Sequence, residues 1–227
     1  MCGVKSESYF QPELFRFLTE LKKHNRRDWF LRNKQRYEDD LKAPALRFIT
    51  YAGPELEKIS AQLLADPRPT RGSLFRIYRD TRFSPDKRPY KTHVGMHFTH
   101  RLSRKDVHAP GIYLHLEPQQ CFLAGGLWQP PSPELTKVRE AIVRSPQRWK
   151  KAIRGLELGG DSLKRAPRGY DPEHPLVEDL KRKDFIASVA LSDSQVCSAK
   201  FMGEFGRGCR QLAPLLEFLS EALGMKW

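Results

Sequence analysis

Long apolar runs are missing from this sequence. No stretch approaches the roughly 18 to 20 consecutive apolar residues that a membrane-spanning helix requires. The first ten residues, MCGVKSESYF, also lack the apolar segment of a secretory signal. We therefore expect a protein that does not insert into a membrane and that resides in the cytoplasm.

Cysteine is scarce, and several common motifs are absent. The four cysteines are widely spaced and form no CxxC pair, which argues against a zinc ribbon or a disulfide framework. Neither GxGxxG nor GxxxxGK(S/T) occurs, so the common nucleotide-binding folds are not indicated. The nucleophile motif GxSxG is also missing. None of these common motifs therefore indicates which reaction, if any, the protein catalyses.

Acidic residues are few relative to basic ones. The chain has 40 Lys and Arg against 27 Asp and Glu, which gives a net charge of +13. The excess is concentrated in residues 68–105, where eleven basic residues accompany two acidic ones. Such a density favours an anionic partner, such as phosphate, a nucleotide or nucleic acid, through long-range attraction.

Apolar periodicity predicts the secondary structure. Helical spacing predicts helices over residues 12–24, 28–42, 55–64, 134–143 and 198–223, with a break at Gly53-Pro54. Alternation predicts strands over residues 74–83, 94–100, 111–117, 121–128 and 185–191. Short links between consecutive strands indicate an antiparallel meander.

These elements predict one α+β domain covering residues 1–227. We expect an antiparallel sheet of about four or five strands, packed against helices from the N- and C-terminal parts of the chain. Residues 1–9 are expected to form a mobile tail. No internal repeat or long linker divides the sequence.

The predicted strand over residues 74–83 carries most of the candidate chemistry. Its alternation places Arg76, Tyr78, Asp80 and Arg82 on one face and Phe75 and Phe83 toward the core. In a meander, polar residues of the next two strands share that face. This pattern is typical of a basic cleft that binds an anion, although a solvated charged strand would have the same sequence.

The candidate site residues follow from that arrangement. The expected catalytic groups, which would move protons near neutral pH, are His115, Glu117 and Asp80. The expected ligand-binding groups are Arg76, Arg79, Arg82, Lys87, Tyr90, His93 and Tyr113. The favoured function is binding, with turnover left open, of a phosphate-bearing or otherwise anionic small molecule.

Three alternatives use the same residues. A metal site is one: His93 and His97 lie about 13 Å apart along an extended strand, too far to share an ion, but His97 with His115 and Glu117 remains available. A nucleic-acid-associated module and a purely structural ion network around Asp80 are the others. We assign no cofactor, no metal ligand and no oligomeric state from the sequence.

The same segment also carries a family resemblance. The letters RIYRDTRF at residues 76–83, followed by Asp86, Lys87 and Tyr90, fit the pattern RxxRDxRFxxDKxxY. This resembles the motif of a bacterial and fungal family, domain of unknown function 2461. Further similarity lies in DWF at 28–30, KTH at 91–93, YLHLEP at 113–118, GGLW at 125–128 and KRKDF at 181–185. The resemblance covers nearly the whole chain, and it implies no activity, cofactor or catalytic residue.

Overall fold

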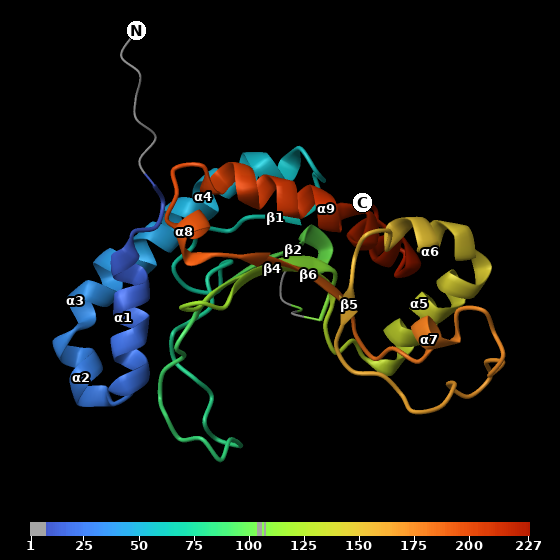
Figure 1. Ribbon diagram of the computed structural model, residues 1–227, viewed down its shortest axis with the longest axis horizontal. Coiled ribbons are helices and arrows are strands. Elements are labelled where there is room, and N and C mark those ends of the chain that lie inside the picture. Colours follow the sequence, from blue (N-terminus) through green and yellow to red (C-terminus); the bar gives the residue numbers. More distant parts are fainter. Residues whose placement is uncertain (1–7, 104–105, 107) are drawn as a thin grey trace, which may run out of the picture.

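A six-stranded antiparallel sheet lies at the centre of the molecule (Figure 1). The computed structural model describes residues 8–103, 106 and 108–227, and within them the strand order is β1-β2-β3-β4-β6-β5. The strands are β1 (Leu63–Leu64), β2 (Val94–His100), β3 (Gly111–Leu116), β4 (Cys121–Leu127), β5 (Leu158–Gly159) and β6 (Phe185–Leu191). The predicted α+β class is confirmed. The sheet has more strands than expected because β1 and β5, at two residues each, are too short to show alternation.

Helices come from both ends of the chain. Before the sheet are α1 (Pro12–Lys23), α2 (Arg27–Arg32), α3 (Lys34–Arg36), the π-helical turn η1 (Tyr37–Lys42) and α4 (Ala43–Glu57). The 3₁₀ turn η2 (Arg101–Ser103) follows β2, and later come α5 (Ser132–Arg144), α6 (Pro146–Ala152), α7 (Val177–Leu180), α8 (Asp193–Val196) and α9 (Phe201–Ala222). In the described part of the chain, no helix has the length and apolar character needed to cross a bilayer.

Two local predictions concern the N-terminal part of the chain, namely a break at Gly53-Pro54 and a mobile tail over residues 1–9. The predicted break at Gly53-Pro54 is wrong, because α4 continues through both residues to Glu57. Ala52 and Leu56, one turn apart, are both fully buried, so packing holds the helix together against the local preference. Residues 1–7 of the expected mobile tail lie outside the described residues. Tyr9 also belongs to the expected tail, and its ring packs edge-on against Phe48 with centroids 5.5 Å apart.

The helices α4 and α9 cover one face of the sheet (Figure 1). The residues of β2 and β3 that point toward them are buried: Val94, Met96, Phe98, Ile112, Leu114 and Leu116. Contact with α9 is close, since a Cβ atom at Gly208 would lie 2.7 Å from Cδ2 of Leu123. Alternation turns the intervening residues to the opposite side, which we call the open face.

Residues 74–83 do not form the predicted strand. Leu74 makes only an isolated bridge to Met96, and Tyr78 another to Tyr90. Between them the backbone is irregular, and we call residues 76–90 the arginine loop. It hangs from the sheet on the side away from α9 (Figure 1).

Local hydrogen bonds explain why this segment leaves the sheet. The Asp80 carboxylate accepts from the backbone N–H of Arg82 at 3.2 Å, and that of Asp86 accepts from the N–H of Arg88 at 3.0 Å. Such side-chain-to-backbone bonds bend the chain and compete with a strand ladder. Pro85 further lacks the N–H that a ladder would need.

The base of the arginine loop is firmly held. The Lys91 N–H donates to the Ile77 carbonyl at 2.8 Å. The Asn25 side chain donates to the Tyr90 carbonyl at 2.9 Å and accepts from the Tyr90 N–H at 3.0 Å. The Tyr90 ring stacks on Phe30 with centroids 4.1 Å apart. These contacts fix the residues that flank the loop beside the open face.

Candidate functional site

The open face carries a cavity of about 570 Å³. This volume lies within the range of about 300–1,000 Å³ typical of small-molecule sites. Its apolar lining consists of Phe75, Ala109, Phe122, Ala124, Trp128 and Ile186. Its polar lining consists of Lys91, His93, His97, Tyr113 and His115. The cavity therefore joins an apolar wall to a cluster of nitrogen-bearing side chains.

Two glycines let aromatic rings lie flat on the sheet beneath the cavity. A Cβ atom at Gly95 would lie 2.6 Å from the Tyr113 hydroxyl, and one at Gly111 would lie 2.7 Å from Nε2 of His97. Cross-strand pairing explains both contacts. His97 is directly opposite Tyr113, so Gly95, two residues before His97, is diagonal to Tyr113, and Gly111, two residues before Tyr113, is diagonal to His97. Glycine at these positions makes room for the two rings.

A hydrogen-bonded chain runs along β3. The Tyr113 hydroxyl lies 3.1 Å from Nδ1 of His115, and Nε2 of His115 lies 3.3 Å from Oε2 of Glu117. The other Glu117 oxygen accepts from the Thr92 hydroxyl at 3.4 Å and from the Lys22 ammonium at 3.5 Å. The side chains of His115 and Glu117 are only 12% and 15% exposed. This chain is suited to holding or moving a proton.

Burial controls the charge state of this cluster. It raises the pKa of Tyr113 to about 12, so the phenol stays protonated at neutral pH. It lowers the pKa of His115, an effect that the contact with Glu117 opposes. It also lowers the pKa of His93 to about 4, with the neighbouring His115 acting in the same direction, and that of His97 to about 4. His93 and His97 are therefore neutral imidazoles near pH 7.

Three side chains of the polar lining have nitrogens without a partner in the described part of the chain. Lys91 is half-buried, and its ammonium lies 5.1 Å from the centroid of the Phe75 ring. No hydrogen bond or ion pair from a described residue reaches this ammonium, and the same is true of the His93 and His97 rings. Burial, with a smaller contribution from Arg76, lowers the pKa of Lys91. The fully buried polar atoms without a partner in the described residues belong to Glu134, Trp149 and Ser220, so the nitrogens of Lys91, His93 and His97 keep contact with solvent and are open to a ligand that enters the cavity.

Metal-ligand geometry occurs at one place in the described residues. His93, His115 and Glu117 each offer a ligand atom, and these atoms lie within 4.8 Å of one another. The alternative of His97 with His115 and Glu117 is not formed. The pairing of His97 with Tyr113 places it toward the other end of β3, whereas His93 precedes β2 beside the Glu117 end.

Three of the four arginines of the arginine loop pair with carboxylates of the same loop. Arg82 and Asp80 lie 2.7 Å apart, and Arg88 and Asp86 also lie 2.7 Å apart. Arg79 forms a further ion pair with Asp86. Hydrogen bonds from Arg82 hold the pKa of Asp80 down at about 2, and those from Arg88 and then Arg79 hold the pKa of Asp86 well below its usual range.

Several sequence-predicted site residues therefore lie apart from the cavity. Those that do not line it are Arg76, Arg79, Asp80, Arg82, Lys87, Tyr90 and Glu117. Lys87 instead donates to the Thr81 carbonyl at 3.0 Å, and Tyr90 is buried against Phe30. The structure brings together His93, Tyr113 and His115 at the cavity, with Glu117 in contact with His115. The difference arises because the strand that would have aligned the two groups is a loop.

Sequence reasoning missed the residues that complete the cavity. Phe75 was predicted to face the core, yet it lines the cavity, because Leu74 pairs with the buried Met96 and takes the core side, which turns Phe75 to the opposite face. Lys91 lies on the same side of an extended chain as His93 and His97, so continuing the β2 alternation three residues before Val94 would have found it. Nothing in the local pattern marks Phe122 or Trp128 as cavity residues.

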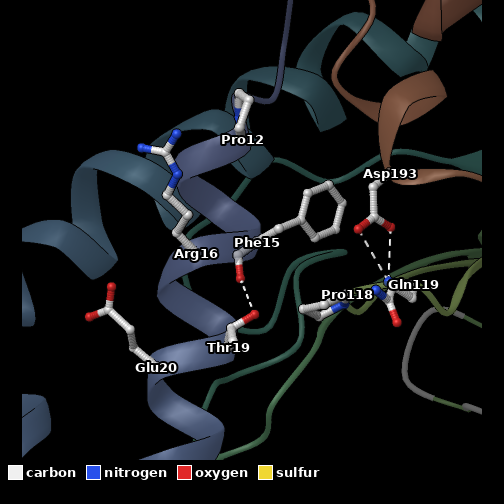
Figure 2. Close-up of a pocket in the computed structure, with 8 residues that line it drawn as sticks. All are labelled: Pro12, Phe15, Arg16, Thr19, Glu20, Pro118, Gln119 and Asp193. Carbon is white, nitrogen blue, oxygen red and sulfur yellow. Dashed lines mark hydrogen bonds between the residues drawn. The ribbon is translucent and has the colours of Figure 1, made fainter.

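A second hollow, of about 370 Å³, lies between α1 and the turn after β3. Figure 2 shows its lining: Pro12, Phe15, Arg16, Thr19, Glu20, Pro118, Gln119 and Asp193. Its polar groups already have partners. The Gln119 N–H donates to both Asp193 oxygens, at 3.0 and 3.2 Å, and Thr19 donates to the Phe15 carbonyl at 2.8 Å. This hollow is therefore the weaker candidate for a ligand site.

Comparison with known proteins gives a family and no further relative. No curated protein and no solved structure matches the chain. The family described as "Conserved hypothetical protein (DUF2461)" matches residues 13–218, which is most of the sequence. The chain therefore belongs to the DUF2461 family of conserved hypothetical proteins.

Proposed function

We propose that this protein binds a small molecule with a flat apolar body and an anionic group in the cavity of the open face. The observation that carries this proposal is the set of unpartnered nitrogens of Lys91, His93 and His97 in the described part of the chain. These nitrogens keep contact with solvent, and a bound anion would accept their hydrogen bonds in place of water.

The apolar wall accounts for the flat body of the ligand. Phe75 and Phe122 provide aromatic surfaces, and the small side chains of Ala109 and Ala124 leave space beside these rings. Trp128, which is 51% exposed, stands on the rim. Aromatic faces at such a site favour stacking with a planar group.

The polar end accounts for the anionic group. Lys91 supplies a positive charge, and the imidazoles of His93 and His97 supply hydrogen bonds to a carboxylate, sulfonate or phosphate. Beside them, the hydrogen-bonded Tyr113–His115–Glu117 chain offers an imidazole that can act as a base. A proton transfer on the bound molecule is the reaction class that this end of the cavity supports.

A pair of fluorescent probes tests the proposal. The anionic probe is 1-anilinonaphthalene-8-sulfonate, and the neutral one is N-phenyl-1-naphthylamine, which has a similar aromatic body. Lys91→Met should weaken binding of the sulfonate about tenfold or more, because a hydrogen bond to a charged group contributes about 1.5–3 kcal/mol. It should leave the affinity for the neutral probe within about twofold.

Arg82→Met is the matched control, because it removes one cation from the arginine loop and none from the cavity. Sulfonate affinity in this variant should stay within about twofold of the unsubstituted protein at 0.15 M salt. Equal weakening by both substitutions, or none with Lys91→Met, would show that the cavity does not bind the anion as proposed.

Nucleic-acid association is the second candidate, and it is favoured by the tip of the arginine loop. Phe83 is 93% exposed, and the Arg82 guanidinium lies 5.7 Å from its ring centroid. An exposed aromatic ring beside arginine can stack a base. Titration of a labelled single-stranded oligonucleotide at two salt concentrations tests this candidate. Tight binding with a steep salt dependence, lost in Phe83→Ala but kept in Lys91→Met, would favour it over the cavity.

A further inference from the structure

The two strands β2 and β3 bring two imidazoles and a carboxylate to the same end of the open face. His93 directly precedes β2, His115 lies within β3, and Glu117 directly follows it. Their ligand atoms lie within 4.8 Å of one another. In a tetrahedral site with bonds of about 2.0–2.1 Å, the ligand atoms would be about 3.4 Å apart. Small side-chain rotations therefore suffice to close the set around one ion.

The atoms behind this set already orient it. The Tyr113 hydroxyl hydrogen-bonds to Nδ1 of His115. The other ring nitrogen, Nε2, therefore faces Oε2 of Glu117 at 3.3 Å. Thr92 and Lys22 engage the other oxygen, Oε1, of the same carboxylate. Metal-binding histidines and carboxylates usually have such partners on the atom that does not bind the ion.

His93 has no partner that would explain its position. Its ring centroid lies 4.4 Å from that of His115, and no described residue hydrogen-bonds to either of its nitrogens. His115 and Glu117 hydrogen-bond to each other, which leaves His93 as the member of the three without a partner. A shared cation would bind His93 together with the other two groups.

We infer that His93, His115 and Glu117 bind a divalent transition-metal ion of the zinc class, with His115 binding through Nε2 and Glu117 through Oε2. Nitrogen and oxygen ligands in this ratio suit Zn²⁺, Co²⁺ or Fe²⁺ better than Mg²⁺ or Ca²⁺, which prefer oxygen alone. Three protein ligands leave at least one coordination position open. Because His93 and His115 line the cavity, that position faces the place where a small molecule would sit.

The test is a titration of the full chain, stripped with a chelator, with Co²⁺ and then Zn²⁺. Co²⁺ should bind at about one ion per chain and produce visible absorption bands, and Zn²⁺ should displace it. His93→Ala, His115→Ala and Glu117→Gln should each weaken Co²⁺ binding at least about 100-fold. Tyr113→Phe, which keeps all three ligands, should weaken it about 10- to 100-fold, as expected for a residue that orients a ligand.

His97→Ala is the matched control, because His97 lies on the same face and in the same cavity but outside the set of three. Its Co²⁺ affinity should stay within about twofold of the unsubstituted protein. Circular dichroism would establish that each variant is folded, and Tyr113→Phe and Glu117→Gln carry the test if a histidine variant is not. The inference is overturned if the unsubstituted protein binds no ion, or if His97→Ala weakens binding as much as His93→Ala.

Metal binding and ligand binding can fail separately. The ion titration needs no organic molecule, and the naphthalene probes can be titrated into the chelator-stripped protein. Loss of Co²⁺ binding in Glu117→Gln with an unchanged affinity for the sulfonate would support the metal site independently of the proposed ligand.

Discussion

The arginine loop and the cavity lining differ in how their charges are used. The loop contains four arginines, and three of them pair with Asp80 or Asp86 within the loop. The cavity lining contains one lysine and three histidines, a lower charge density, yet Lys91, His93 and His97 have nitrogens with no partner among the described residues. A dense run of charge in a sequence thus shows where charged residues are, whereas binding requires polar groups, charged like Lys91 or neutral like His93 and His97, that the fold leaves without a partner.

The largest predicted effect is on the free energy of unfolding, and it compares a residue of the cavity wall with a residue of the core beneath it. Leu123 and Phe122 are neighbours on β4 and point to opposite faces, with Leu123 only 1% exposed under α9. Leu123→Ala should lower the free energy of unfolding by about 2–5 kcal/mol, because it leaves a void in a closely packed core. Phe122→Ala should lower it by about half as much, because its ring is partly exposed. Urea unfolding measures both.

For probe affinity we expect the opposite order, with the larger loss in Phe122→Ala and the smaller in Leu123→Ala. Phe122→Ala removes a ring that lines the cavity and stacks on His115 with centroids 4.7 Å apart, so both naphthalene probes should bind several-fold more weakly. Leu123→Ala should leave the affinity of the folded protein within about twofold. A similar loss of probe binding in both variants would mean that the cavity is not distinct from the core.

The next effect tests the floor of the cavity. Gly111→Ala places a Cβ atom 2.7 Å from Nε2 of His97, so the ring must move or the strands must separate. We expect the free energy of unfolding to fall by about 1–3 kcal/mol and the sulfonate probe to bind more weakly.

Gly203→Ala is the control for Gly111→Ala. It lies within α9, and a Cβ atom there meets nothing within 4 Å. This substitution should raise the free energy of unfolding by about 0.5–1 kcal/mol, because alanine favours the helix. Destabilisation by both alanines would indicate a general intolerance rather than a crowded cavity floor.

The regular elements were predictable because their signals are local. The strands β2 and β6 match the expected residues 94–100 and 185–191, since Val94, Met96 and Phe98 alternate with residues that face the opposite way. The same parity placed His93, Tyr113, His115 and Glu117 on one face. Strand alternation is a property of the backbone, so it can be read without the rest of the fold.

The arginine loop was not predictable in this way. Residues 74–83 alternate as well as a strand does, and their departure from the sheet depends on the hydrogen bonds of Asp80 and Asp86 and on the anchoring of Tyr90 by Asn25. Whether a side chain finds a partner is equally non-local. The sequence therefore indicated a basic site but could not show that Lys91, rather than Arg82, would be left unpaired.

The smallest predicted effect concerns the arginine loop itself. Arg82 holds the pKa of Asp80 at about 2, below its ordinary value of 3.8, so the pair stabilises the fold fully above about pH 4. That contribution is lost as the pH falls from about 4 to about 2, as Asp80 becomes protonated in the folded state. Asp80→Asn should be slightly less stable than the unsubstituted protein at pH 5, and most of this difference should be gone at pH 2, where about half of Asp80 is protonated in the folded state. Urea unfolding across this range measures it.

Arg82→Met should show the same loss of pH dependence, because it removes the partner that shifts the pKa. Both groups are exposed, so 1 M salt should shrink the difference at pH 5. Neither variant should change the affinity for the sulfonate probe. If Asp80→Asn instead unfolded the protein at neutral pH, the loop would be a structural ion network on which the fold depends. The two regions would then differ because the loop stabilises the fold and the cavity lining binds a ligand, rather than because only the cavity has unpaired polar groups.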